Sequence, residues 1–348
     1  MWFISLLVLI FILGIIILVH EFGHFIWAKI FKVHIYEFSI GMGPIIFTHK
    51  GKDKIDYNIR AIPIGGFVSM AGEVYEDDNK INKKALMCNK PWWQRLIILV
   101  AGVTNNFIMA LIFLFFMALI WGGETSDLVI DQIQEGSAIS EVDIQVGDKL
   151  LEVDGKKVTS WEIAQIRLIM ETEDNEHTLT VQEPDGSLKK VNVTPNIEDV
   201  NGVETPRYGF SVNQEIMTGF GNSIKYAFHK FGNIVHSMAL TVGGLFNGSI
   251  SLNALSGPVG MYEVVDQSMS YGISQIIYII AFLSINVGFI NILPFPAFDG
   301  GRVLFLIIEK IKGSPVNSKI ENAFHMVGFI LLIILMIYIT IQDVFRFF

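Results

Sequence analysis

Residues 20–24 read His-Glu-Phe-Gly-His, a pattern that could hold a metal ion. On a helix, residues four apart share one face, so His20 and His24 can both reach the same ion. Neutral imidazoles suit Zn²⁺, and a catalytic zinc site keeps one position open for water. Zinc lowers the pKa of such a water to about 7, and Glu21 could take its proton. The motif therefore predicts hydrolysis of a peptide bond, with Glu21 as the catalytic base.

A zinc site of this kind needs a third protein ligand from elsewhere in the chain. The metzincin pattern requires Gly and His at two later positions, where this chain has Trp27 and Ile30, so that pattern is excluded. His34 and Glu37 remain as local candidates without a recognisable pattern. Asp299 is the better candidate, because two prolines break the helix just before it. Broken helix at membrane depth is tolerated where it lines a cavity, and a carboxylate there needs a partner.

The elements that must position these residues are membrane spans. Half of the chain is hydrophobic (51%) and only 17% of it is charged. About 20 consecutive apolar residues suffice to cross a bilayer as a helix. The first such run has no Lys or Arg before Lys29, so we interpret it as a retained span and not as a secretory signal peptide. The four predicted runs are Met1–Val19, Leu96–Gly123, Gln267–Phe298 and Asn322–Gln342.

The distribution of charge predicts the orientation of these spans. Residues 29–95 carry 11 Lys and Arg against 7 Asp and Glu, and residues 300–321 carry 4 against 2. Residues 123–215 carry only 7 against 20. Because Lys and Arg are enriched in cytoplasmic loops, we expect the two basic segments inside and the acidic segment outside. The net charge of −9 argues against nucleic acid as a partner, and the single cysteine, Cys88, excludes an intrachain disulfide.

The acidic segment contains a predicted α/β domain of short strands, one helix and a hairpin. The predicted elements are Leu128–Ile130, Lys149–Val153, the helix Trp161–Met170, and the paired strands Thr178–Gln182 and Lys190–Val193. The strings Gln134–Ala138, Val146–Leu151 and Val153–Gly155 resemble a bacterial PDZ domain. Such a domain binds an extended peptide, often a free C-terminus, at a sheet edge. An unrelated α/β insert is the alternative.

A second resemblance joins the two ends of the chain. Residues 291–300 follow the string Asn-x-x-Pro-x-Pro-x-x-Asp-Gly, and with His-Glu-x-x-His they resemble the site-2 protease family of intramembrane metalloproteases. The resemblance implies that Asp299 is the third zinc ligand. Phe298 stands where the family usually has Leu. Further strings are similar to the bacterial branch that includes the regulator-of-sigma-E protease: Glu37–Pro44, Ile62–Met70, Gly102–Asn106 and Ser256–Gly260. Many members carry two PDZ domains, whereas this chain has room for one.

The same resemblance implies parts that handle the substrate. Ile55–Met70 is similar to a membrane-dipping β-hairpin, whose edge could pair with an unwound substrate; the alternative is an ordinary cytoplasmic hairpin. Residues that hold the substrate or position the site are then Gly65, Gly66, Phe67, Asn106 and Asn291. For the two asparagines, hydrogen bonding between helices is the alternative.

The expected fold is therefore a polytopic α-helical membrane protein with about four transmembrane helices, a membrane-dipping β-hairpin and one inserted α/β PDZ domain. The expected parts are residues 1–123 with the zinc motif, residues 124–200 as the extracytoplasmic PDZ domain, residues 201–266 as a linker with interfacial amphipathic helices, and residues 267–348 with the Asp-Gly motif. Met217–Phe246 is the expected interfacial helix.

The predicted function is that of an intramembrane zinc metalloprotease in the lipid bilayer of the bacterial inner membrane, with its active site toward the cytoplasm. The resemblance implies single-span membrane substrates already shortened by another protease, such as anti-sigma factors or remnant signal peptides. Two alternatives are a membrane scaffold that presents a PDZ domain and a metal transporter that uses His20, His24 and Asp299. The intact His-Glu-x-x-His favours the protease, since transport needs no general base beside the ligands.

Overall fold

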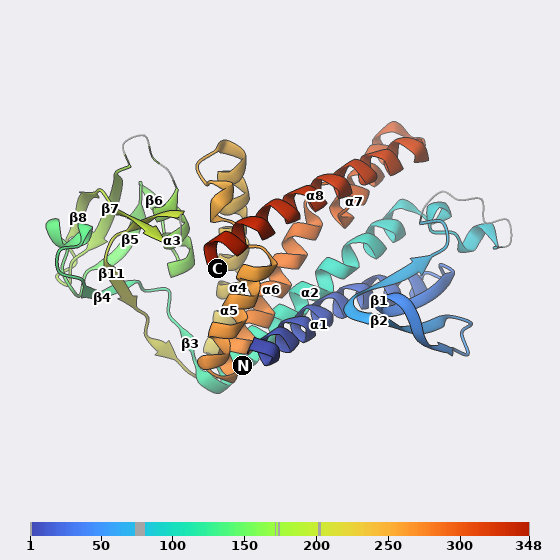
Figure 1. Ribbon diagram of the computed structural model, residues 1–348, viewed down its shortest axis with the longest axis horizontal. Helices are drawn as coiled ribbons and strands as arrows, with labels where there is room; N and C mark the ends of the chain where they lie inside the picture. The colour runs from blue at the N-terminus through green and yellow to red at the C-terminus, as the bar shows by residue number, and fades with distance from the viewer. Residues whose placement is uncertain (1, 74–80, 171, 173–174, 201–202, 348) are drawn as a thin grey trace. The chain divides into compact units, whose positions relative to one another are not determined.

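The computed structural model describes residues 2–73, 81–170, 172, 175–200 and 203–347 (Figure 1). The chain divides into two compact units. Unit 1 comprises Met1–Phe113 and Met261–Ile337, and unit 2 comprises Leu114–Gly260 and Tyr338–Phe348. Helices α2 and α8 each contribute to both units.

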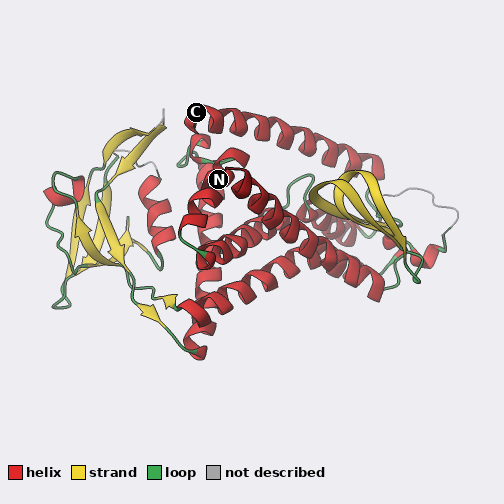
Figure 2. Cartoon of the chain, turned by 60° about the horizontal axis from the view of Figure 1, so that its bottom comes forward, coloured by secondary structure: helices red, strands yellow, loops and turns green. Residues whose placement is uncertain are grey.

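Four helices of the described part are long and apolar enough to cross a membrane (Figure 2). They are α1 (Trp2–Ile30), α2 (Trp92–Trp121), α6 (Ile273–Ile292) and α8 (Ser318–Phe347). Much of their apolar surface is exposed, as expected for side chains that face lipid. Four spans agree with the number expected from the sequence.

All four helices differ from the predicted runs in their bounds, and α1 and α6 differ most. The first run was predicted to end at Val19, but α1 continues to Ile30, so His20 and His24 lie within one continuous helix. The third run was predicted to begin at Gln267, but the helix breaks at Gly272, whose φ of +95° is open to glycine. Helix α5 (Pro258–Ser270) therefore ends before α6 begins.

The predicted hairpin within Ile55–Met70 is wrong in its extent. That whole segment is one strand, β2 (Asp56–Met70), and it pairs with β1 (Ile35–Lys50). Residues 37–40 pair with residues 66–69 on one side and with residues 56–59 on the other. Residues 45–50 pair with residues 56–60 beyond them. The two long strands thus fold into a small curled sheet, and residues 66–70 form one of its edges.

This hairpin lies along α1. Near the end of α1, Lys29 donates a hydrogen bond of 2.7 Å to Asp53 in the loop between the strands. Far back along the helix, the carbonyl oxygen of Pro63 lies 3.6 Å from the position of a Cβ built on Gly14. At 1.5 Å per helical residue, the hairpin therefore follows α1 for ~22 Å.

Among the described residues of unit 1, two ion pairs link α7 (Asp299–Lys312) to neighbouring elements, and buried apolar side chains form two cores. Arg302 pairs with Glu73 just after β2, and Arg95 donates a 2.6 Å hydrogen bond to Glu309. One core joins α1, the hairpin and α2, and the other joins α1, α5 and α6. The buried residues of the first core are Phe25, Ala28, Val33, Ile35, Phe38, Ile55, Val68, Met70, Met87, Ile98, Leu99 and Leu306. The buried residues of the second core are Leu9, Ile12, Ile16, Val265 and Ile279.

Unit 2 contains a sheet with the strand order β11-β4-β5-β7-β8 and a short helix, α3 (Trp161–Ile169). The strands are β4 (Val129–Ile133), β5 (Lys149–Val153), β7 (His177–Gln182), β8 (Leu188–Val193) and β11 (Phe210–Asn213), with β6 (Lys156–Lys157) beside β5. The expected domain end at residue 200 excludes β11, which pairs with β4 and so extends the sheet past that boundary. A hairpin of β9 (Asn196–Val200) and β10 (Val203–Arg207) intervenes before β11 in the chain.

The long helix α4 (Phe220–Asn247) packs against this domain inside unit 2. Lys230 of α4 is buried and pairs with Glu162 of α3 and with Glu124. Burial raises the pKa of Glu162, but the Lys230 ammonium outweighs it and holds that pKa below its ordinary value. Asn233 adds hydrogen bonds to Thr159. The smaller elements are β3 (Gly123–Glu124), β12 (Ile216–Met217) and the 3₁₀ turns Lys83–Ala85, Met87–Asn89, Ala138–Glu141 and Leu252–Ala254.

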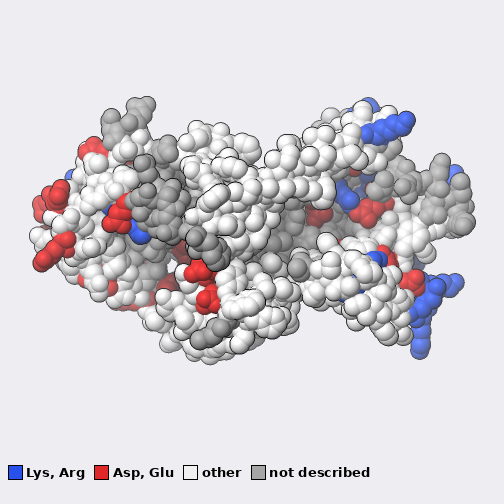
Figure 3. Space-filling model, in the orientation of Figure 1, with Lys and Arg blue, Asp and Glu red and all other residues white. Residues whose placement is uncertain are grey.

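Charge is distributed differently in the two units (Figure 3). In unit 1, Lys and Arg side chains gather over the β1–β2 loop and over the connection between α7 and α8. In unit 2, Asp and Glu side chains gather over the sheet domain. These two groups of basic side chains lie at the same end of unit 1.

Candidate metal centre and peptide groove

His20, His24 and Asp299 come together in unit 1, although 275 residues separate the second from the third. Oδ2 of Asp299 lies 3.0 Å from Nε2 of His20 and 3.3 Å from Nε2 of His24. The possible ligand atoms of the three residues all lie within 4.8 Å of one another, and both imidazoles are buried. Two imidazole nitrogens and one carboxylate oxygen are a donor set that suits catalytic zinc and leaves a fourth position open.

The two helices that carry these ligands each have a local reason to present them. The i, i+4 spacing in α1 brings the His20 and His24 rings to 4.9 Å between centroids. Asp299 is the first residue of α7, where a carboxylate is stabilised by the positive end of the helix dipole. A Cβ on Gly300 would lie 2.2 Å from the carbonyl oxygen of Leu293, so the sharp turn before α7 requires glycine there.

Glycines on α1 and α2 make room for the centre. A Cβ on Gly23 would lie 2.4 Å from the carbonyl oxygen of Ala101, so the two backbones are in direct contact. A Cβ on Gly102 would lie 2.5 Å from Nε2 of His24 and 2.6 Å from Nε2 of His20. Because Gly102 has no side chain, the space in front of both ligand nitrogens is free, and an ion must occupy that space. The donor set and the free space together fit Zn²⁺.

Hydrogen bonds to the other ring nitrogens orient the two imidazoles. Nδ1 of His24 lies 2.7 Å from the carbonyl oxygen of Ile98, which can only accept, so Nδ1 carries the proton. Nδ1 of His20 lies 3.4 Å from the side-chain amide of Asn106, which is fully buried. In His24, the proton on Nδ1 leaves the Nε2 lone pair directed at the centre, which is the tautomer that binds metal.

Glu21 lies between the centre and the edge of the hairpin sheet. Its Oε2 accepts a 3.2 Å hydrogen bond from the backbone N–H of Val68. A Cβ on Gly66 would lie 3.8 Å from Cγ of Glu21, so the same strand passes close to the side chain. The Glu21 carboxylate therefore lies beside both the centre and the edge of the sheet.

The five residues expected to handle the substrate are not all brought to this site. Asn106 contacts His20, and Gly66 approaches Glu21. Gly65, with φ +85°, and Phe67 flank Gly66 in the edge segment, and the Phe67 ring lies 4.9 Å from the guanidinium of Arg60. Asn291 is half-buried in the last turn of α6.

Sequence reasoning missed several residues that shape the centre. Gly102 stood in a string that was noted only for its family resemblance, and nothing in an apolar run marks one glycine as facing two histidines. The N–H of Val68 is a backbone group with no sequence signal. Both residues become visible only through the packing of α2 and the hairpin on α1.

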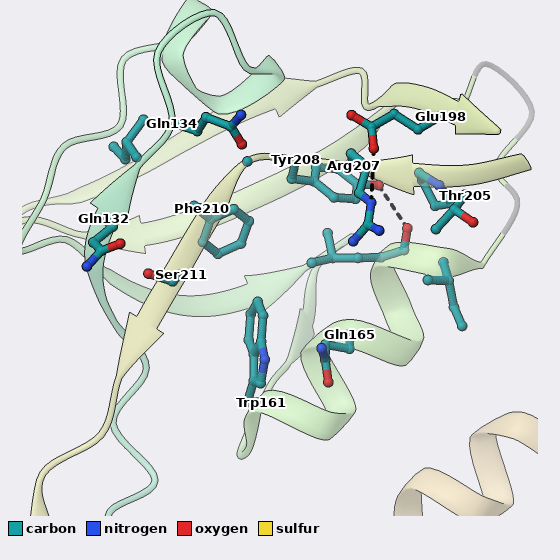
Figure 4. A pocket seen from close by; sticks show the side chains of 15 residues that line it. Gln132, Gln134, Trp161, Gln165, Glu198, Thr205, Arg207, Tyr208, Phe210 and Ser211 are labelled. Atoms are coloured by element: carbon teal, nitrogen blue, oxygen red, sulfur yellow. Dashed lines mark hydrogen bonds and ion pairs between the residues drawn. The ribbon is translucent and has the colours of Figure 1, made fainter. Parts of the chain in front are cut away.

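A second candidate site is a groove of about 930 Å³ in unit 2, between α3 and the strand β11 (Figure 4). Trp161 of α3 and Phe210 of β11 form its apolar floor, with ring centroids 5.6 Å apart. Tyr208 closes one end by donating a 2.8 Å hydrogen bond to the carbonyl oxygen of Leu168, and burial raises the pKa of its hydroxyl, which stays protonated. Among the described strands, β11 is the terminal one of its sheet, so its outer edge faces the groove unpaired.

Comparisons with known proteins identify the family of this chain. The profile of peptidase family M50 matches residues 8–335. FN1322 of Fusobacterium nucleatum is 37% identical over 352 residues, and the zinc metalloprotease RasP of Shouchella clausii is 31% identical over 422 residues. The regulator of sigma-W protease RasP of Bacillus subtilis is 28% identical over 422 residues. Each alignment covers 99% of this chain and 99% of the relative.

These matches assign an enzyme activity and a metal. The relatives named as zinc metalloproteases match along their whole length, so Zn²⁺ is the cofactor of this chain. A peptidase assignment supports neither the non-enzymatic scaffold nor the metal transporter considered above. The chain belongs to peptidase family M50, the site-2 protease family, and is a zinc metalloprotease of the membrane.

Proposed function

We propose that this protease hydrolyses a peptide bond within or near the membrane-spanning segment of single-span proteins that another protease has already shortened. The observation that carries the proposal is the position of the three candidate ligands. His20 and His24 lie on a membrane-spanning helix, six or more residues before its end at Ile30, and Asp299 joins them. At 1.5 Å per residue, the centre lies ~9–15 Å from the end of α1, which is inside the bilayer.

In the proposed mechanism, His20, His24 and Asp299 hold the metal, and Glu21 moves the proton. Zn²⁺, when bound, lowers the pKa of water and polarises the scissile carbonyl. Glu21 accepts the proton of the attacking water as the new C–O bond forms. It then donates that proton to the nitrogen of the leaving amine as the C–N bond breaks, so the carboxylate is regenerated after each turnover.

The hairpin supplies a place for the substrate backbone. A peptide bond inside a helix is shielded by its own hydrogen bonds, so the substrate must unwind before it can react. Residues 66–70 form a sheet edge, and the N–H of Val68 in this edge already points at Glu21. We infer that an unwound substrate segment pairs with this edge and is thereby held beside the centre. Gly66 and Phe67 form part of that edge, and Gly65 directly precedes it.

We also propose that the hairpin dips into the membrane. It follows α1 from Lys29 back to Gly14, a residue in the middle of an apolar span. Its far end exposes large apolar side chains that would be costly in water but are stable in lipid. They are Met42, Ile45, Ile46, Phe47 and Ile62. Arg60 within it is paired, because it donates hydrogen bonds to Glu37, Ser39 and the carbonyl oxygen of Gly43.

The orientation follows from the charge pattern. Lys and Arg at the β1–β2 loop and at the α7–α8 connection support a cytoplasmic location for that end of unit 1. The acidic sheet domain is then extracytoplasmic, and the membrane is the bacterial cell (inner) membrane. The active site faces the cytoplasmic half of the bilayer, since His24 is near the cytoplasmic end of α1.

The experiment that tests the function is cleavage of a model single-span protein by the purified chain in lipid vesicles. We expect products whose new ends lie within the cytoplasmic half of the membrane-spanning segment, as identified by mass spectrometry. A zinc chelator should stop the reaction, and added Zn²⁺ should restore it. The matched control is the same substrate with a soluble linker in place of its apolar segment. Cuts confined to the soluble parts of both proteins would contradict the proposal.

For the sheet domain we propose a PDZ fold whose groove binds an extended peptide with a free C-terminus. Five antiparallel strands, a helix beside the outer strand and an unpaired edge over an apolar floor support this assignment. Anti-sigma factors or remnant signal peptides shortened by a first cut would present such a C-terminus. The alternative, a domain that only excludes large proteins, predicts no binding of short peptides.

Binding to the groove can be measured with a fluorescent peptide that ends in apolar residues. We expect Trp161→Ala in the full chain to weaken this binding by ~10-fold, because it removes an aromatic anchor from the floor. Amidation of the peptide C-terminus should also weaken binding. The control is Leu188→Ala on β8, at the opposite edge of the same sheet, which should bind as the unaltered chain does. No binding to the unaltered chain would favour the size-exclusion alternative.

A further inference from the structure

The loop between α6 and α7 holds a backbone conformation that its sequence does not favour. This loop comprises residues 293–298 and leads directly into Asp299. Ala297 has a φ of +72°, in the left-handed region that side chains other than glycine rarely adopt. Such a conformation persists only where the surrounding structure over-determines it, and it is a reason to look for the groups that hold it.

The last span, α8, supplies those groups. Nδ1 of His325 accepts a 3.0 Å hydrogen bond from the backbone N–H of Ala297. One turn later on α8, a Cβ on Gly328 would lie 1.9 Å from Cβ of Pro296, so the proline ring rests directly against the α8 backbone. A Cβ on Gly301 would lie 3.2 Å from Cε1 of His325. His325 thus contacts the chain on both sides of Asp299.

The tautomer of His325 is fixed by this contact. Nδ1 accepts a hydrogen bond from the backbone N–H of Ala297, so the ring proton must be on Nε2. Nε2 is buried and has no hydrogen-bond partner among the described residues. An aromatic apolar residue would fill the same space beside Phe305 and Phe324 without this unsatisfied group. The presence of histidine at this position is therefore explained by the hydrogen bond that its Nδ1 accepts, and not by the packing of its ring.

We infer that His325 is a positioning residue for Asp299, and that α8 thereby sets the geometry of the third candidate metal ligand. The inference rests on the proposed role of Asp299 at the metal centre. His325 itself is not one of the three candidate ligands. It fixes the N–H of Ala297, which fixes the turn, and the turn places the carboxylate beside the two imidazoles at 3.0 and 3.3 Å.

The test compares three replacements of His325 by their affinity for zinc, measured by competition with a chelator in detergent solution. His325→Ala removes the acceptor and should weaken zinc binding by ~10–100-fold, as expected when an outer partner of a ligand is lost. His325→Asn places Oδ1 where Nδ1 was, so it should retain zinc within ~3-fold of the unaltered chain. His325→Gln places its oxygen one bond further away and should resemble His325→Ala.

The matched control is Met326→Ala, because Met326 is the next residue of α8 and is 65% exposed. A His325→Ala variant that binds zinc as tightly as the unaltered chain would overturn the inference. A His325→Asn variant that loses as much zinc affinity as His325→Ala would also overturn the inference. The imidazole ring as a whole, and not its acceptor atom Nδ1, would then be what zinc binding requires. These measurements need no substrate. A chain that binds zinc as expected but cleaves no membrane protein would refute the proposed function alone.

Discussion

Replacing Glu21 with Gln is expected to lower the turnover of a single-span substrate by ~10²–10⁴-fold while the chain keeps its zinc. Gln has the shape of Glu, and its side-chain oxygen can still accept the hydrogen bond from the N–H of Val68. It has no basicity, so it can neither take the proton of water nor return it to the leaving nitrogen. The loss should therefore be in kcat, and zinc content should match that of the unaltered chain.

The control for this variant is Glu135→Gln, which makes the same chemical change at an exposed position of unit 2. Both proteins should be compared in the vesicle assay, with zinc measured by elemental analysis on the same samples. Equal turnover by Glu21→Gln and the unaltered chain would reject Glu21 as the base. If Glu21→Gln had lost its zinc, the result would instead show that Glu21 helps to hold the metal ligands in place.

Replacing Gly102 with Ala is expected to abolish both zinc binding and proteolysis. The added Cβ would lie 2.6 Å from Nε2 of His20 and 2.5 Å from Nε2 of His24. Zinc must approach both nitrogens to about 2.0–2.1 Å, so the methyl group and the ion compete for the same space. Zinc content by elemental analysis and cleavage in vesicles should both fall below detection, although alanine is the better helix former.

The matched control is Gly14→Ala on α1. A Cβ there would lie 3.6 Å from the carbonyl oxygen of Pro63, an ordinary van der Waals distance. This variant should bind zinc and cleave substrate as the unaltered chain does. If Gly102→Ala held zinc normally, the ion would have to lie elsewhere than in front of the two Nε2 atoms, and the proposed centre would be wrong.

The chemistry of the centre could be predicted from the sequence more readily than its surroundings. The pattern of His20, Glu21 and His24 is local, because helical spacing alone decides which side chains share a face. The prediction of Asp299 as the third ligand depended on the family resemblance, since no local rule relates a residue at the start of α7 to one in α1. Gly102, Val68 and His325 could not be predicted, because their roles arise from contacts between elements that the sequence does not place side by side.

The errors in the fold also have physical causes. Ile55–Met70 was expected to form a β-hairpin from its family resemblance, but residues 56–70 continue as one strand through Gly65, whose φ is +85°. A glycine pair such as Gly65-Gly66 can mark either a turn or a position inside a strand. Here the pairing of β2 with β1 shows that the pair lies inside a strand. Strand β11 lies beyond the expected domain end at residue 200 and still pairs with β4. It follows the hairpin of β9 and β10, and no local sequence signal shows that a strand after such a hairpin belongs to the same sheet.

The contact between Gly23 and Ala101 limits how a helical substrate can reach the catalytic residues. Because the backbones of α1 and α2 touch there, neither helix can rotate or slide past the other without driving atoms into a carbonyl oxygen. These two helices therefore form a fixed wall behind the ion. We therefore expect a substrate polypeptide and the water for its hydrolysis to arrive between other elements, on the side of the centre where β2 and the turn before α7 lie.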